Sequence, residues 1–358
     1  MSFKYTLQSD TLPWVGYNLL ENPDEVLAAA AEAGYEGIDL PGNPHRMDGK
    51  EWRKRVEKAG LVVPEVLAAW GYYHAGEERN LASSDAAARE RAVQYAKDTV
   101  DLAADAGALY TQLCAAQPAV PQLPWPVESV EVLRANFRES IREVCEHAAG
   151  RGIGILLEPL NNYEGLPGVL TTLYEAVNYI DELGFDDLGV QPDIYHMNIE
   201  EGSIPDALRN AGPRIRHFHL NETNHCMHGT GHADYQEVFR ILKGIGYDGY
   251  ICTYMPKTTQ ANLQNAPGSP GASTASDWNR PELVEVLGDI LGFLKETERA
   301  VDQSREFYEA DGFRARPGPA VRRKREIRWK RTGCVRRCWP ESRCWGRCWV
   351  WAARTRPN

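Results

Sequence analysis

The sequence predicts an α/β protein in which eight parallel strands close into a barrel. Short apolar runs alternate with amphipathic helical patterns from residue 3 to about residue 299. Strands that alternate with helices form parallel sheets, and eight such units favour a closed (β/α)8 barrel, also called a TIM barrel. The alternative, an open doubly wound sheet, would need a glycine-rich phosphate loop after its first strand, and the sequence has none there.

The eight expected strands are short apolar runs that end at a polar residue, a glycine or a proline. They cover residues 3–7, 35–40, 61–67, 108–113, 154–158, 188–193, 215–219 and 249–254. We expect these strands to be buried on both faces, because the helices of an α/β barrel cover the outer face of its sheet.

The expected helices begin at capping residues and carry apolar residues at helical spacing. The first of them has Asn22 as an N-cap, Pro23 at the first helical position and Glu25 three residues after the cap. Gly34 ends it. The complete set covers residues 23–33, 49–59, 85–106, 130–149, 171–183, 204–210, 235–246 and 281–299.

The composition is that of a cytoplasmic globular protein. Apolar residues make up 43% and charged residues 25% of the 358-residue chain. No apolar run reaches the ~18 residues of a membrane span, and no signal-peptide core follows Met1. Cys114, Cys145, Cys226 and Cys252 are scattered through the body, which indicates reduced thiols.

The charge is divided unevenly along the chain and marks a boundary. Residues 313–358 hold fifteen Lys or Arg against two Glu, which leaves about −23 for the rest of a chain whose net charge is −10. A body this acidic repels a phosphate backbone, so nucleic acid is not expected as a partner. We therefore expect a barrel over residues 1–305 and a separate basic tail over residues 313–358.

The tail (residues 313–358) is rich in arginine, tryptophan and cysteine. Its cysteines have a C-x3-C-x5-C-x3-C spacing, which departs from the usual spacing of small zinc modules. The composition is instead typical of out-of-frame translation of a GC-rich sequence, and we expect the tail to be disordered. The Gly/Pro/Ser-rich residues 264–276 are expected to form a loop or lid.

Glu158, Asp193 and His219 each close an apolar run in three consecutive strand–helix units. Singly, such residues are more often a cap, a turn former and a core histidine. Together, at the carboxyl ends of barrel strands, they are expected to share one divalent cation, Mn²⁺, Mg²⁺, Co²⁺ or Zn²⁺. Such an ion polarises the carbonyl of a hydroxy-ketone, while a neighbouring carboxylate takes a proton from the adjacent carbon. The pattern indicates a metal-dependent enzyme for a small sugar-like substrate.

Several segments of the chain resemble motifs of one enzyme family. They are residues 158–164 (EPLNNYE), 193–201 (DIYHMNIEE), 217–219 (HFH), 229–232 (GTGH) and 246–249 (GYDG). They are similar to segments of the sugar phosphate isomerase/epimerase family with the xylose isomerase-like TIM barrel, which includes ketose 3-epimerases and hydroxypyruvate isomerases. The similarity extends over roughly residues 3–300.

The resemblance implies a role for each matching residue. Glu158, Asp193 and His219 would be the metal ligands, and Glu158 would also be the base that transfers the proton. Glu164 and His196 would hydrogen-bond the oxygens of the substrate near the reacting carbons. The resemblance also favours a homo-oligomer.

Three positions depart from the family pattern, and one of them is Asn162, where the motif has Arg. Tyr254 stands where the family has a last-strand Glu that is both fourth ligand and second base. His225 stands where the family often has an Arg, six residues after the ligand histidine, and we assign it to substrate binding. Tyrosine, with an ordinary pKa near 10, is a poor base. Tyr254 is therefore expected to act as a weak ligand or a proton donor, and a single carboxylate base favours a same-face 1,2-shift.

The function expected from these observations is a metal-dependent isomerase or epimerase of a sugar or sugar phosphate that acts through an enediolate. One alternative is a dehydratase of the inosose or dehydroshikimate type on the same scaffold, in which the enediolate expels a β-hydroxyl. Another is a sugar-binding relative that has lost catalysis because Tyr254 replaces the last-strand Glu. Neither a membrane nor a nucleic acid is expected as a partner.

Overall fold

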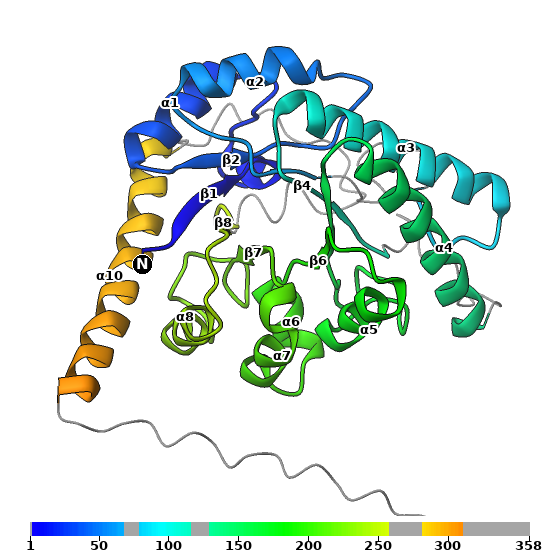
Figure 1. Cartoon of the computed structure of the whole chain (residues 1–358). Coiled ribbons are helices and arrows are strands. Elements are labelled where there is room, and N and C mark those ends of the chain that lie inside the picture. Colours follow the sequence, from blue (N-terminus) through cyan, green and yellow to red (C-terminus); the bar gives the residue numbers. More distant parts are fainter. Residues whose placement is uncertain (1, 68–78, 116–128, 258–280, 311–358) are drawn as a thin grey trace, which may run out of the picture. The chain divides into compact units, whose positions relative to one another are not determined.

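The computed structural model describes residues 2–67, 79–115, 129–257 and 281–310, which form an eight-stranded parallel barrel (Figure 1). The strands are β1 Lys4–Gln8, β2 Gly37–Asp39, β3 Glu65–Val66, β4 Tyr110–Leu113, β5 Gly154–Leu157, β6 Leu188–Val190, β7 His217–Leu220 and β8 Tyr250–Thr253. The tail at residues 313–358 and the loop or lid at 264–276 lie outside the described residues. Both therefore stay predictions, as does the domain boundary.

Two four-stranded sheets make up the ring, in the orders β2-β1-β8-β7 and β3-β4-β5-β6. All paired strands are parallel. Backbone bridges close both seams: Leu40 pairs with Val66 between β2 and β3, and Val190 pairs with Ile215 between β6 and β7. The (β/α)8 barrel expected from the eight strand–helix units is confirmed.

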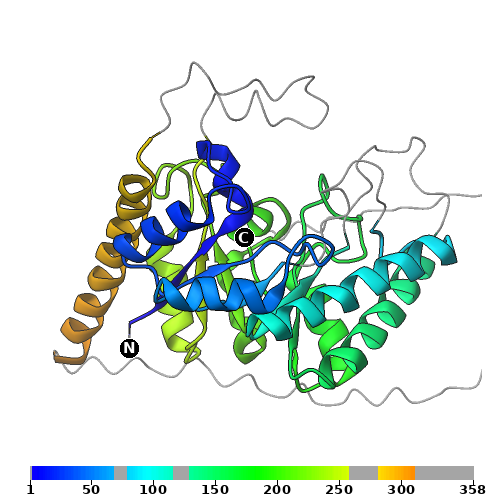
Figure 2. The same cartoon turned by 90° about the horizontal axis from the view of Figure 1, so that it is seen from above.

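The helices surround the strands (Figure 1). They are η1 Ser9–Val15, α1 Pro23–Ala33, α2 Gly49–Lys58, α3 Ala86–Ala106, α4 Val130–Ala149, α5 Leu173–Leu183, α6 Ile194–Glu200, α7 Ile204–Ala211, η2 Gly212–Arg214, α8 Tyr235–Gly244 and α10 Leu283–Ala310. Figure 2 shows α3 beside α4, and α10 beside α1. This order follows the chain, as expected for consecutive strand–helix units.

The helix ends follow the capping chemistry of the sequence. The Asp85 side chain accepts hydrogen bonds from the backbone of the first turn of α3, and Thr172 and Glu175 form a capping box at α5. Asn22 precedes α1, but its side chain makes no capping hydrogen bond. The start of the helix is favoured instead by Pro23, whose fixed φ angle suits the first helical position. Gly34 ends α1 in the left-handed conformation.

Several elements differ from the sequence-based expectation, among them the short 3-10 helices η1 and η2, which were not expected. The short helix α6 (Ile194–Glu200) was not expected, because Asp193 both follows strand β6 and caps the helix, which leaves no connecting segment to mark a helix start. Helix α10 continues to Ala310 instead of ending near residue 299, since no glycine or proline interrupts the sequence there. Among the described helices, none combines the length and the apolar character that crossing a bilayer requires.

The barrel interior contains buried polar side chains among apolar ones. Five of these polar side chains are fully buried and come from five different strands or strand ends: Thr6, Asp39, Glu65, Gln112 and Gln191. Barrel interiors are usually filled by branched apolar residues, and a buried polar group is costly unless it is hydrogen-bonded. The buried polar side chains of the interior therefore indicate that the candidate site lies at the end of the barrel where the strands end.

Candidate active site

Three elements bring the expected ligands to one point. Glu158 follows β5, and its backbone N–H donates to Leu113 O of the neighbouring strand. Asp193 follows β6 and caps α6, with its carboxylate accepting from the backbone of Tyr195 and His196. His219 lies in β7 and forms a parallel bridge with Asp193. Consecutive parallel strands thus place all three at the carboxyl end of the barrel.

The three side chains contact one another inside the protein. His219 Nδ1 lies 3.0 Å from Glu158 Oε1 and 3.8 Å from Asp193 Oδ2. Their exposed fractions are 0% for His219 and Glu158 and 1% for Asp193. Two carboxylates and an imidazole nitrogen with almost no access to water are a donor set that a divalent cation satisfies, since the ion compensates charges that are otherwise costly to bury.

Charge interactions within this cluster shift the proton equilibria. Burial raises the pKa of Glu158, but the His219 imidazole outweighs it and holds the pKa below its ordinary value. Burial lowers the pKa of His219, but Glu158 and Glu65 hold it well above its ordinary range. Burial raises the pKa of Asp193. The His219 imidazole thus favours the ionised form of Glu158.

Tyr254 faces the same cluster from the end of β8. Its hydroxyl lies 2.7 Å from His219 Nδ1. Burial, together with the nearby Asp193 and Glu158 carboxylates, raises the pKa of the Tyr254 hydroxyl well above its ordinary value. The phenol therefore keeps its proton at neutral pH and is suited to donating a hydrogen bond.

His196 and Glu164 lie beside the cluster. Asn161 donates hydrogen bonds to His196 Nδ1 from its backbone and its side chain, at 3.2 and 2.8 Å. In the neutral ring this leaves the proton on Nε2, which lies 3.9 Å from Glu164 Oε2. A ring nitrogen of His196 also lies within 4.8 Å of ligand atoms of Glu158 and Asp193. His196 thus lies beside the site, where its ring suits the binding of a substrate oxygen.

His225 occupies an aromatic enclosure next to Tyr254. Its ring stacks on Tyr195 with the centroids 3.7 Å apart, and Trp14 and Tyr254 lie at 5.1 and 5.9 Å. Burial, reinforced by the Lys257 charge, lowers the pKa of His225 to about 2. Neither ring nitrogen has a hydrogen-bond partner among the described residues. His225 therefore offers a neutral ring where an arginine would offer a cation.

A buried carboxylate fixes the loop that carries His225. Glu222 accepts hydrogen bonds from the backbone N–H groups of Thr223 (2.8 Å), Gly229 (2.9 Å) and Ala233 (3.3 Å). Gly231 allows this close approach, because a Cβ atom there would lie 2.3 Å from Glu222 Oε1. The segment 229–232 singled out in the sequence therefore folds around Glu222.

Stability is expected to depend on the ionisation of Glu222. Burial raises the pKa of Glu222, but the backbone N–H groups outweigh it and hold the pKa below its ordinary value. Its contribution is thus complete above the unfolded pKa of ~4.3 and is lost as the pH falls through the lower folded pKa. We expect Glu222→Gln to cost about 1–3 kcal/mol at pH 7. Denaturant unfolding of both proteins from pH 7 to pH 3 measures this, and a difference that does not shrink at acid pH would contradict it.

Sequence reasoning missed several residues that support the site. Gln112 hydrogen-bonds to Glu158, Asn161 orients His196, and Asn221 Nδ2 donates to Asp193 at 3.0 Å. Glu65 lies 3.3 Å from His219. For Gln112 and Glu65 a signal was present, because each is a polar residue inside an otherwise apolar strand run.

Similarity to known proteins agrees with the fold and the site. The eight parallel strands and the helices around them place the chain in the general class of (β/α)8 barrel proteins. Residues 27–281 match the family described as xylose isomerase-like TIM barrel, and the chain belongs to this family. The family resemblance carried by the sequence motifs is therefore confirmed.

The relatives with assigned activities include sugar epimerases. A ketose 3-epimerase of Arthrobacter globiformis is 28% identical over 242 residues, which cover 67% of this chain and 80% of the relative. A D-psicose 3-epimerase of Enterocloster bolteae is 32% identical over 210 residues, which cover 56% of this chain and 63% of the relative. A solved structure of an L-ribulose 3-epimerase superposes with a TM-score of 0.70 at 21% identity, over 88% of this chain and all of that chain, and shows the shared fold. These names agree with the isomerase class expected from the sequence.

Proposed function

We propose that this protein is a metal-dependent isomerase or epimerase of a small ketose or related hydroxy-ketone. The observation that carries the proposal is the convergence of Glu158, Asp193 and His219 at one buried point at the carboxyl end of the barrel. Named sugar epimerases among the relatives support the same class. We place the activity in the barrel, residues 1–305, and assign no part of it to residues 313–358.

Glu158, Asp193 and His219 would hold the ion, which we propose to be Mn²⁺, Mg²⁺, Co²⁺ or Zn²⁺. When bound, a divalent ion supplies Lewis-acid polarisation of a carbonyl and stabilisation of developing negative charge. His196, whose ring lies beside the site, would orient a substrate hydroxyl together with Glu164. His225 and Tyr195 would close the wall of the site, from which their stacked rings exclude water.

Glu158 would take the proton from the carbon next to the substrate carbonyl and leave an enediolate. Return of that proton to the neighbouring carbon on the same face gives a shift between ketose and aldose. Return of a proton on the opposite face gives an epimer and needs a second donor. In this chain we assign that role to the Tyr254 hydroxyl, which lies 2.7 Å from His219 Nδ1.

Proton exchange with heavy water tests the proposal. The full-length protein, loaded with Mn²⁺ or Co²⁺ and then freed of excess ion, is incubated in D2O with D-psicose, L-ribulose or their aldose isomers. Deuterium at C3 of a C3 epimer supports epimerisation, whereas deuterium at C2 of an aldose product, or at C1 of a ketose product, supports the 1,2-shift. Loss of water from the product would instead identify the dehydratase. Sugar binding without any exchange, or exchange that survives chelator treatment, would overturn the proposal.

Tyr254→Phe is expected to separate the two isomerase activities. Removal of the hydroxyl takes away the second proton donor while the ring still fills the space beside His225. Epimer formation should therefore fall by roughly 10²-fold or more, while the 1,2-shift that needs Glu158 alone should change far less. Product ratios from the same D2O incubation measure this. An equal fall in both products would show that Tyr254 has no separate role in proton return.

A further inference from the structure

The two ring nitrogens of His219 share Gln191 as a neighbour but differ in their other contacts. Nδ1 faces the proposed ion site, at 3.0 Å from Glu158 Oε1 and 2.7 Å from the Tyr254 hydroxyl. Nε2 lies 3.3 Å from Glu65 Oε2 and 2.7 Å from the Gln191 amide, which is farther from Nδ1, at 3.1 Å. The ring thus stands between the mouth of the barrel and a set of buried polar groups below it.

Gln191 links His219 to Glu65. With its amide oxygen towards the imidazole, Gln191 accepts from His219 Nε2 at 2.7 Å, and its amide nitrogen donates to Glu65 Oε1 at 2.7 Å. This orientation satisfies both partners, whereas the reverse would place like groups together. All three residues are fully buried, so no water competes for these contacts.

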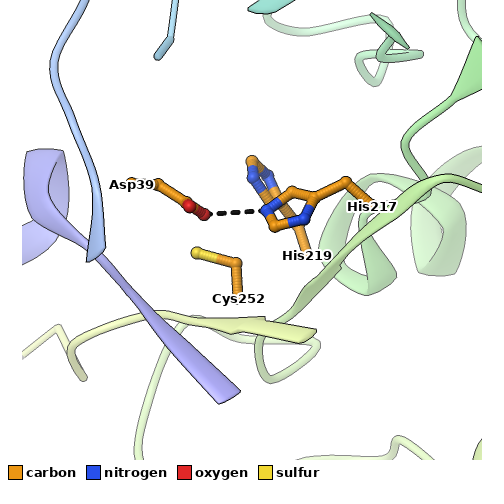
Figure 3. Close-up of side chains that lie close together, drawn as sticks. All are labelled: Asp39, His217, His219 and Cys252. Carbon is orange, nitrogen blue, oxygen red and sulfur yellow. Dashed lines mark hydrogen bonds and ion pairs between the residues drawn. The ribbon is translucent and has the colours of Figure 1, made fainter. Parts of the chain in front are cut away.

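Glu65 also contacts buried polar groups other than Gln191. Its Oε2 lies 3.6 Å from His217 Nε2, and the same nitrogen lies 2.8 Å from Asp39 Oδ2 (Figure 3). The Thr6 hydroxyl donates to Asp39 Oδ2 at 3.2 Å. These contacts restrict rotation of Glu65, His217 and Asp39, although His217 Nδ1 and Asp39 Oδ1 have no hydrogen-bond partner among the described residues.

We propose that Glu65, acting through Gln191, is a positioning residue that keeps Nε2 of His219 as a hydrogen-bond donor and Nδ1 as the atom presented to the cation. The inference rests on the proposed metal site. A histidine that ligates a metal generally donates its other ring N–H to a carboxylate, carbonyl or water, which fixes its orientation and tautomer. In this chain the Gln191 amide and the Glu65 carboxylate would together fix the orientation and tautomer of His219.

A second ion deeper in the barrel is the competing arrangement. Ligand atoms of Asp39, His217, His219 and Cys252 lie within 4.8 Å of one another, and Figure 3 shows Asp39 and Cys252 pointing towards the same space. Asp39 Oδ2, however, already contacts the Thr6 hydroxyl and His217 Nε2, while Asp39 Oδ1 has no hydrogen-bond partner among the described residues. The geometry favours a hydrogen-bonded network that supports His219 over a second ion site. The number of ions bound per protein chain distinguishes these two arrangements.

Metal binding to the full-length apoprotein tests the proposal independently of turnover. Wild type, Glu65→Gln, Glu65→Ala and Gln191→Met are titrated with Co²⁺ by calorimetry, and the visible d–d spectrum of each complex is recorded. We expect one ion per chain, with affinity lowered by about 10- to 100-fold and an altered spectrum in the variants. Glu65→Ala should show the largest effect and Glu65→Gln, which keeps one acceptor oxygen, the smallest.

Glu298→Gln serves as the matched control, because Glu298 is also a buried carboxylate but lies on α10, away from this network. Its affinity and spectrum should equal those of the wild type, even where its thermal unfolding changes. Variants that bind Co²⁺ as the wild type does would overturn the inference while leaving the proposed function intact. Two ions per chain, with one lost in Cys252→Ser, would also overturn it. A wild type that binds no Co²⁺ would remove the proposed function and this inference together.

Discussion

Glu158→Gln is expected to lower turnover by roughly 10²- to 10⁴-fold, the usual contribution of a positioned general base. Glutamine has nearly the same shape and still meets Gln112 and His219, which both contact the Glu158 carboxylate. It cannot accept a proton from carbon. The loss should therefore appear in kcat when metal and substrate are both saturating, and solvent deuterium should no longer enter the substrate.

Comparison with Asp193→Asn separates the base from the ligand. Asp193 caps α6 and accepts from Asn221, and it is not proposed to move a proton. Its variant should bind metal more weakly but recover much of its turnover when metal is added, whereas Glu158→Gln should not recover. Glu32→Gln, an exposed carboxylate on α1, is the control for a surface change. Unchanged deuterium exchange in Glu158→Gln would show that another group is the base.

The fold could be predicted from the sequence because its signals are local and repeated. Each strand is a short apolar run and each helix has a cap or a glycine stop, so eight units could be counted without tertiary information. Helix α6 was missed because its cap, Asp193, was already interpreted as a strand-end ligand. Asp193 follows a strand and also caps a helix, but a single residue in the sequence indicated only the first of these roles.

The convergence of Glu158, Asp193 and His219 could be anticipated because strand ends of a parallel barrel meet at one face. The support beneath His219 could not, because it depends on contacts between residues as far apart as Glu65 and His219. The surroundings of His225 were equally hidden. Its left-handed backbone, with φ of 56°, and its stacking on Tyr195 result from the loop around Glu222, and no local pattern encodes them.

Glu298→Ala is expected to cost about 2–4 kcal/mol of folding stability. The Glu298 carboxylate joins the last helix of the barrel to its first strand, because it accepts from the backbone N–H of Phe3 at 3.0 Å and the Tyr5 hydroxyl at 3.3 Å. It also pairs with Lys243 Nζ at 3.0 Å. Truncation leaves these donors buried without that acceptor, although Lys243 keeps its contact with Asp302 at 2.7 Å.

Urea unfolding measures this cost, and Glu296→Ala is the matched control, because Glu296 lies on the same helix but is exposed. The control should stay within about 0.5 kcal/mol of the wild type. Glu298→Gln should lose less than Glu298→Ala, since its amide oxygen still accepts from Phe3. Equal stability of Glu298→Ala and Glu296→Ala would mean that α10 is held by its apolar face against α1 and α8 alone. Closure of the barrel would then depend on packing and not on this carboxylate.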